Sequence, residues 1–148
     1  MKVLATLAAA MVLSACSVEI PVGDKPVTDN GWPTAGRATR LNDAHYAYCR
    51  SGDLAVKVDL SKSDLAVPVV KGAAVQVKAN AQSGFQKMAV SLETQGIVDG
   101  ATQVTLMLDA AEKPAVILET KDGVDGSFWY VVGGTYTGGA CRFYAEGI

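Results

Sequence analysis

Apolar and polar residues alternate with a period of two along most of the chain after Ala38. The pattern is clearest in five runs, residues 54–60, 75–78, 88–92, 103–109 and 116–119. Successive side chains of a β-strand point to opposite faces, so each run predicts a strand with one buried face. The run from Phe128 to Val132 is apolar throughout, which predicts a strand covered on both faces.

Three other segments are less regular. Leu65 to Val70 is a shorter run, and because Pro68 has no backbone N–H it predicts a strand at a sheet edge or a bulge. The spacing of apolar residues from Thr39 to Arg50 is compatible with one face of a helix and with the alternation of a strand. We favour a strand that begins at about Ala44 and follows a turn of helix. Ala140 to Ala145 predicts the last strand.

Turn residues separate these runs. The hairpin signals are Ser51-Gly52-Asp53, Asp99-Gly100, Asp122-Gly123 and Asp125-Gly126, and Gly133-Gly134 and Gly138-Gly139 predict positive φ or a bulge. Strands therefore recur about every ten to twelve residues with short turns between them. This spacing predicts an all-β fold, a single antiparallel β-sandwich or small β-barrel of about eight or nine strands.

The N-terminal residues have the features of an export signal. Lys2 gives a positive start, and Val3 to Val12 form an apolar run that only Thr6 interrupts. A helix of this length reaches about 15 Å, too short for a bilayer core of about 30 Å. Leu13-Ser14-Ala15-Cys16 resembles the lipobox of bacterial lipoproteins. The alternative is an ordinary secretory signal with an incidental cysteine.

The lipobox resemblance implies cleavage before Cys16 and a lipid on its thiol, which would anchor the chain to a membrane. In lipoproteins with the usual sorting rule, Asp after the cysteine retains the protein at the inner membrane. Ser17 therefore favours the outer membrane, with the domain facing the periplasm. We divide the chain into a signal peptide (1–15), a lipidated flexible tether rich in Pro and Gly (16–37) and a β domain (38–148). Within the tether, Trp32 is expected to fasten to the domain edge or to lie at the membrane interface.

The chain has three cysteines, so lipidation of Cys16 leaves Cys49 and Cys141. Exported compartments are oxidising, and an even remainder predicts one disulfide between them. The alternative is two separate buried thiols. A redox pair would favour Cys-X-X-Cys spacing, which these residues lack, so we interpret the bond as structural.

Composition excludes several classes of function. Of 148 residues, 49% are apolar, which excludes a disordered chain, and the net charge of −2 argues against a nucleic-acid partner. His45 is the only histidine, and we expect it at a strand rim. No serine lies in Gly-x-Ser-x-Gly, and no His pair or Cys cluster has zinc spacing. We therefore predict no catalytic residue, no metal and no cofactor. Asp122 and Asp125 in one loop leave calcium as a less favoured alternative.

The domain resembles the membrane-bound inhibitors of c-type lysozyme, which are small lipoprotein β-barrels with one disulfide. The matching segments are Cys49-Arg50-Ser51-Gly52, Ser83-Gly84, Phe128-Trp129 and Cys141. In that family a Ser-Gly-x-x-Tyr loop enters the lysozyme cleft, where the Ser hydroxyl bonds catalytic carboxylates. Here the loop reads Ser83-Gly84-Phe85-Gln86-Lys87, with Lys in place of Tyr. The resemblance implies Ser83, Gly84 and Lys87 as partner-binding residues.

We therefore expect a non-catalytic envelope lipoprotein whose β domain binds a protein or envelope partner, with c-type lysozyme as the most specific candidate. The first alternative is a scaffolding lipoprotein of an envelope complex, using a sheet edge or an aromatic patch as its interface. A hydrolase with paired carboxylates is the second, because the sequence does not show which carboxylates meet in space. We expect the aromatic residues mainly to fill the core, and alternatively to form a recognition surface.

Overall fold

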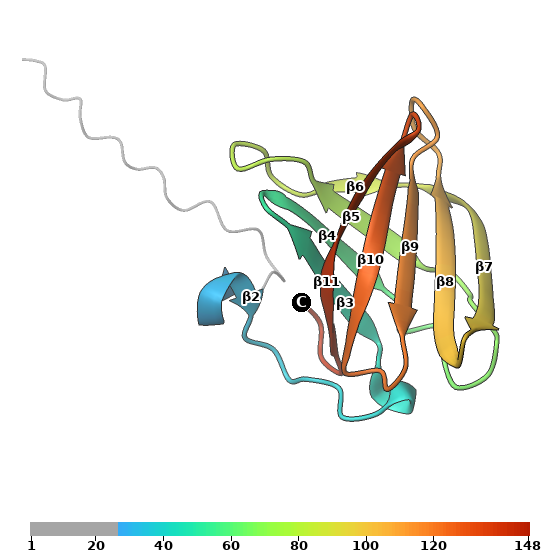
Figure 1. The fold of residues 1–148 in the computed structure, drawn as a ribbon. Helices are drawn as coiled ribbons and strands as arrows, with labels where there is room; N and C mark the ends of the chain where they lie inside the picture. The colour runs from blue at the N-terminus through green and yellow to red at the C-terminus, as the bar shows by residue number, and fades with distance from the viewer. Residues whose placement is uncertain (1–26) are drawn as a thin grey trace, which may run out of the picture.

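The computed structural model describes residues 27–148, which form an all-β domain (Figure 1). Nine strands make one antiparallel sheet in the order β6-β5-β4-β3-β11-β10-β9-β8-β7. The strands are β3 (Tyr46–Ser51), β4 (Leu54–Asp59), β5 (Ala74–Lys78), β6 (Gln86–Met88), β7 (Val90–Val98), β8 (Ala101–Leu108), β9 (Ala115–Thr120), β10 (Asp125–Val132) and β11 (Thr135–Tyr144). The short elements before them are β1 (Val27–Thr28), the 3-10 turn η2 (Asp29–Gly31), β2 (Trp32–Pro33) and the 3-10 turn η3 (Leu41–Asp43).

The sheet curls into a nearly closed barrel because of how its strands connect. Successive strands are neighbours from β3 to β6 and from β7 to β11, and β11 returns to pair with β3. Only Ala89 separates β6 from β7, so one bent segment pairs first with β5 and then with β8. The predicted all-β fold is confirmed, and the arrangement is a barrel rather than a sandwich.

The long loop between β4 and β5 packs against β7. Leu65 in this loop is buried in the core. Two polar side chains of β7 bind the loop's backbone: Gln95 Nε2 donates to the carbonyl of Val67 (3.2 Å), and Glu93 Oε1 accepts the N–H of Ala73 (2.6 Å). These contacts hold the loop beside the last strand of the sheet.

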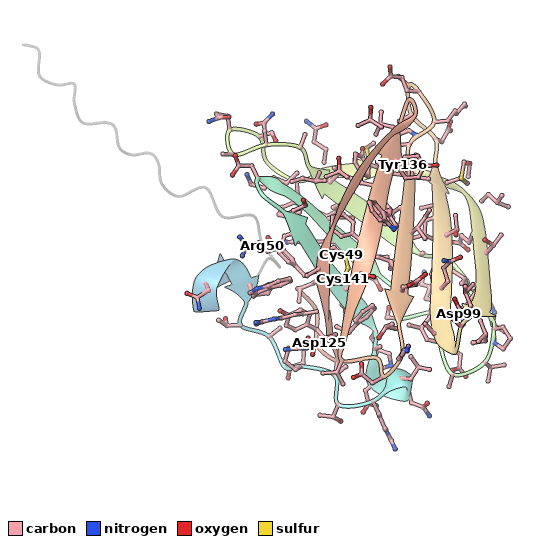
Figure 2. All side chains as sticks on the ribbon, in the orientation of Figure 1. Cys49, Arg50, Asp99, Asp125, Tyr136 and Cys141 are labelled. Atoms are coloured by element: carbon pink, nitrogen blue, oxygen red, sulfur yellow. A yellow bond between two sulfur atoms is a disulfide. The ribbon has the colours of Figure 1, made fainter. Side chains whose placement is uncertain are left out.

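The predicted disulfide is confirmed. Cys49 on β3 and Cys141 on β11 are directly opposite each other in register, and their sulfur atoms are bonded. Both residues are buried in the barrel core (Figure 2). The bond therefore links the first and last strands of the barrel.

The alternating runs form strands whose inward side chains fill the barrel. Fully buried members of the core include Val56, Val58, Leu106, Leu118 and Phe128. As predicted, one turn of 3-10 helix precedes the first barrel strand. Burial of apolar side chains at about 25 cal/mol per Å² is the main contribution that stabilises such a core.

Three of the predicted hairpin signals are turns. Gly52, Asp99-Gly100 and Gly123 have positive φ between consecutive strands, as does Gly133-Gly134 between β10 and β11. Two predictions were wrong. Asp125-Gly126 begins β10, and Gly138-Gly139 lies inside β11 without positive φ, because these glycines provide space for neighbouring groups rather than a turn.

Two predicted strand assignments were also wrong. Leu65 to Val70 is a series of turns with one isolated bridge between Asp64 and Val69. The side chain of Asp64 accepts the N–H of Ala66 (3.0 Å), a local bond that competes with strand pairing. The run from Phe128 to Val132 is a strand, but only its inner face is covered, because Trp129 on the outer face is 49% exposed.

Residues 30–37, which we assigned to the tether, lie against the barrel. Trp32 packs in a small apolar cluster on the outer face with Tyr48 and Tyr144. Arg37 forms an isolated bridge with Tyr144 and donates to the carbonyl of Val124 (2.6 Å). In Figure 1 this segment lies beside β3 and β11. Residues 16–26 of the expected tether, which include Cys16, lie outside the described residues.

Candidate functional site

The loop between β5 and β6, residues 79–85, carries the predicted partner-binding residues Ser83 and Gly84. Figure 1 shows it extending away from the barrel at the end that also carries the β3–β4 turn. Gly84 is exposed, and a Cβ added there would meet no atom within 4 Å. Lys87 is exposed on β6, opposite Gln76 of β5. The three predicted residues therefore lie on one loop and the strand that follows it.

Hydrogen bonds inside the loop define its shape. Ser83 Oγ accepts the N–H of Asn80 (3.2 Å) and lies 3.2 Å from the carbonyl of the same residue, to which it can donate. Asn80 Oδ1 accepts the N–H of Gln82 (2.9 Å), and Lys78 Nζ donates to the Asn80 carbonyl (2.7 Å). A hydroxyl can rotate to donate to a new acceptor, so Ser83 can exchange its bond to Asn80 for one to a partner.

At its C-terminal end, the loop joins a cation–aromatic cluster on the outer face of β3, β4 and β11. The ring of Phe85 meets that of Tyr48 edge to face, with centroids 6.2 Å apart. Lys57 Nζ lies 4.4 Å from the Phe85 centroid, and this lysine is only 6% exposed. These contacts fix the base of the loop on the barrel wall.

Trp32 extends this cluster on the side of β11. Its ring meets that of Tyr48 edge to face at 5.9 Å, and the guanidinium groups of Arg142 and Arg50 lie 4.6 Å and 5.5 Å from its centroid. Arg50 also donates to the carbonyl of Asn30 (2.6 Å). As expected, Trp32 fastens its segment to the domain. The tyrosines that we expected to fill the core include Tyr48, which instead lies in this outer cluster.

A shallow hollow of about 220 Å³ opens beside the cluster. The register places Arg50, Ala55 and Lys78 directly across three neighbouring strands, and all three line the hollow together with Tyr48 and Asp53. The small side chain of Ala55 leaves the space between the two cations. The hollow can accept a carboxylate or another anionic group from a partner surface.

Burial raises the pKa of Tyr48 above its ordinary value of 10, and the nearby positive charge of Arg50 partly opposes this increase. The phenol is therefore neutral at physiological pH. A neutral Tyr48 can donate a hydrogen bond as well as accept one. Tyr48 and Lys57 are buried in the cluster, so the half-buried guanidinium groups of Arg50 and Arg142 are the groups that can meet acceptors on a partner.

The other candidates of the sequence analysis lie elsewhere. His45 is half-buried just before β3, at the end of that strand opposite the β3–β4 turn. Asp125 pairs with Arg37 at 3.0 Å, and Asp122 Oδ1 accepts the N–H of Val124 (2.8 Å). Among residues 27–148, no three His, Cys, Asp or Glu side chains group as metal ligands. No helix in this part of the chain is long and apolar enough to cross a membrane.

Comparison of the chain with protein-family models, with curated proteins and with solved structures finds no match. The interpretation of the site therefore depends on its geometry and chemistry. Sequence reasoning missed the participation of Arg50, Lys57 and Phe85. Phe85, an apolar residue in an otherwise polar loop, was the available signal.

Proposed function

We propose that this chain is a non-catalytic envelope lipoprotein that binds a protein partner through the β5–β6 loop and the cation–aromatic cluster beside it. The packing of the core supports binding at the outer surface, because apolar side chains such as Leu106, Leu118 and Phe128 fill the barrel. The single observation that carries the proposal is the loop itself. It extends from the barrel with Gly84 exposed, and its base is fixed by Phe85.

The most specific partner is a c-type lysozyme. Its cleft holds two catalytic carboxylates, which need hydrogen-bond donors and positive charge if a loop is to occupy it. Ser83 offers a hydroxyl, and exposed Lys87 follows it by four residues. Lys78 and Arg50 line the hollow next to the loop. The donors and cations of this surface therefore complement the charge of the cleft.

The two alternatives predict different surfaces. A scaffold would use an exposed apolar patch, and the pair of Trp129 and Tyr136 on β10 and β11 is a candidate for one. A hydrolase would need two close carboxylates in a concave site. Neither the apolar patch nor a pair of carboxylates involves the β5–β6 loop. A substitution in this loop should therefore impair binding only if the present proposal is right.

Lysis of a peptidoglycan suspension by a c-type lysozyme, with the full chain added in detergent, tests the proposal. We expect inhibition at micromolar chain. Ser83→Ala removes a donor to a charged carboxylate, a loss of about 1.5–3 kcal/mol, which weakens inhibition about ten- to hundred-fold. His45→Ala, at the other end of β3, is the matched control and should inhibit as the parent does.

Two results would change the assignment. Absence of inhibition at micromolar chain removes the lysozyme proposal and leaves the scaffold as the better hypothesis. Inhibition that Ser83→Ala and Lys87→Ala both leave unchanged retains the inhibitor class but removes the loop as its mechanism.

A further inference from the structure

Trp129 on β10 and Tyr136 on β11 form an exposed aromatic corner on the outer face of the sheet. It lies on the β10 side of the cation–aromatic cluster, which is on β3, β4 and β11. Trp129 is 49% and Tyr136 64% exposed. Their ring centroids are 6.1 Å apart and their planes meet at 79°. The two rings are therefore nearly perpendicular, in an edge-to-face arrangement rather than a parallel stack. Figure 2 shows Tyr136 near the end of the barrel that carries the β10–β11 turn.

Gly138 explains why the indole of Trp129 lies flat. The register places Gly138 directly opposite Trp129, and a Cβ at Gly138 would lie 2.6 Å from Cζ3, 2.9 Å from Cε3 and 3.0 Å from Cη2 of the ring. One face of the indole thus rests on the glycine backbone, and the ring remains half exposed. The C–H groups of a sugar ring stack well on a flat, fixed π face of this kind, because its electrons carry partial negative charge.

A row of side chains that can form hydrogen bonds lies next to Trp129 on the same outer face of the sheet. Ser127 precedes it by two residues on β10, so both side chains point outward, about 7 Å apart along the strand. The register places Glu119 opposite Ser127, and Gln103 opposite Glu119. Gln103 Nε2 donates to Glu119 Oε2 (2.9 Å), which orients the carboxylate. A hydroxyl, an amide and a carboxylate in one row are suited to bind sugar hydroxyls.

This polar row leads into a hollow of about 410 Å³ beside the β9–β10 turn. Its lining includes Glu119, Asp122, Asp125 and Ser127, with Lys121 as its one cation. The backbone N–H of Val124 lowers the pKa of Asp122, so this carboxylate is ionised at neutral pH. The hollow therefore carries more negative than positive side chains.

We propose that this face binds an oligosaccharide of uncharged or amino sugars, with one ring stacked on Trp129 against Tyr136 and the next rings directed toward Glu119 and the hollow. The flat indole provides apolar contact, and the carboxylates accept hydroxyl or ammonium protons. Charge disfavours other occupants, because Glu119 and Asp122 would face like charges on an anionic membrane or on a second copy, whereas Asp125 is paired with Arg37. This inference does not depend on the proposed binding of lysozyme.

Isothermal titration calorimetry on the full chain, in a detergent without a sugar headgroup, tests the inference. The probes are a tetramer of N-acetylglucosamine and its deacetylated counterpart. We expect saturable binding below about 1 mM. Trp129→Ala and Tyr136→Ala should each weaken binding at least about tenfold, and Glu119→Gln should weaken the deacetylated probe more than the acetylated one. Ser83→Ala, on the other surface, should bind both probes as the parent does.

Trp129→Phe distinguishes loss of stacking from loss of fold, because a phenyl ring restores part of the π face. We expect its affinity to lie between those of the parent and Trp129→Ala. Absence of heat with both probes at millimolar concentration would overturn the inference, as would equal affinity of the parent and both alanine variants. Self-association or vesicle binding that Trp129→Ala abolishes, without any sugar binding, would assign the corner to a second copy or to a membrane instead.

Discussion

Cys49 and Cys141 lie directly opposite each other on β3 and β11, and their bond crosses the one strand pair that joins the beginning of the barrel to its end. The cysteines are 92 positions apart in the sequence. A cross-link over so long a loop removes much of the freedom of the unfolded chain, about 4–5 kcal/mol in the chain-entropy model.

Reduction of this bond should lower the free energy of unfolding by a few kcal/mol. The measurement is urea unfolding with and without reductant, with the double variant Cys49→Ala, Cys141→Ala as the reductant-insensitive control. In denaturant, iodoacetamide should modify neither cysteine until reductant is added. Alkylation of both thiols without reductant would refute the bond.

Two glycines in strands should respond oppositely to a methyl group. A Cβ on Gly139 would collide with the carbonyl oxygen of Arg50 and come within 2.8 Å of the Phe128 ring. Overpacking of this kind costs about 1–3 kcal/mol, so Gly139→Ala should unfold at lower urea. Gly96 has open space above it, and Gly96→Ala should be neutral or stabilise by up to about 1 kcal/mol. Equal effects of the two substitutions would contradict the packing of β11 against β3.

The alternation of residues was enough to predict the strands and the all-β fold. Leu54 to Asp59 alternates clearly because one face of β4 contacts the core. The same pattern implied that the other face is open, yet Ala55 and Lys57 on that face are buried. Phe85 lies over Lys57 from a loop about thirty positions away, and period-two patterns do not report contacts of that range.

The candidate site was predictable only in part. The turn-forming pair Ser83-Gly84 and the family resemblance pointed to the loop. The corner of Trp129 and Tyr136 was hidden, because an apolar run looks the same whether one face or both are covered. Gly138 was assigned to positive φ or a bulge, since a glycine that leaves space for an indole has the same sequence signature as one that needs positive φ.

Alkaline pH should destabilise the fold through Tyr48. Burial raises its pKa above 10, so the folded chain holds this proton more tightly than the unfolded chain does. The resulting stability is complete below about pH 10 and is lost as pH rises through the folded pKa. Tyr48→Phe should therefore lose less stability than the parent between pH 9 and pH 11, about the range of tyrosine titration.

Urea unfolding at both pH values checks this effect, and Tyr136→Phe is the control because Tyr136 is exposed. Burial also raises the pKa of Tyr130. Both variants should therefore still lose some stability at alkaline pH. An unchanged pH dependence in Tyr48→Phe would contradict the burial of its phenol.

Lipidation should depend on Cys16, which follows Leu13, Ser14 and Ala15 in the motif that resembles a lipobox. Cys16→Ala removes the thiol that would carry diacylglycerol, so the precursor should not reach the mature mass. The measurement is incorporation of labelled palmitate by expressing cells, with Ser17→Ala as the matched control that keeps the thiol. Label that still enters Cys16→Ala would exclude this anchor.

If the chain acts by binding through its β5–β6 loop, a bound partner should protect the backbone of that loop. Amide hydrogen exchange of the full chain, with and without saturating c-type lysozyme, tests it most directly. We expect slower exchange in the loop 79–85 and the adjoining β6, with no change around Trp129 on β10. Exchange that lysozyme leaves unchanged, or slows only on β8 to β10, would contradict it.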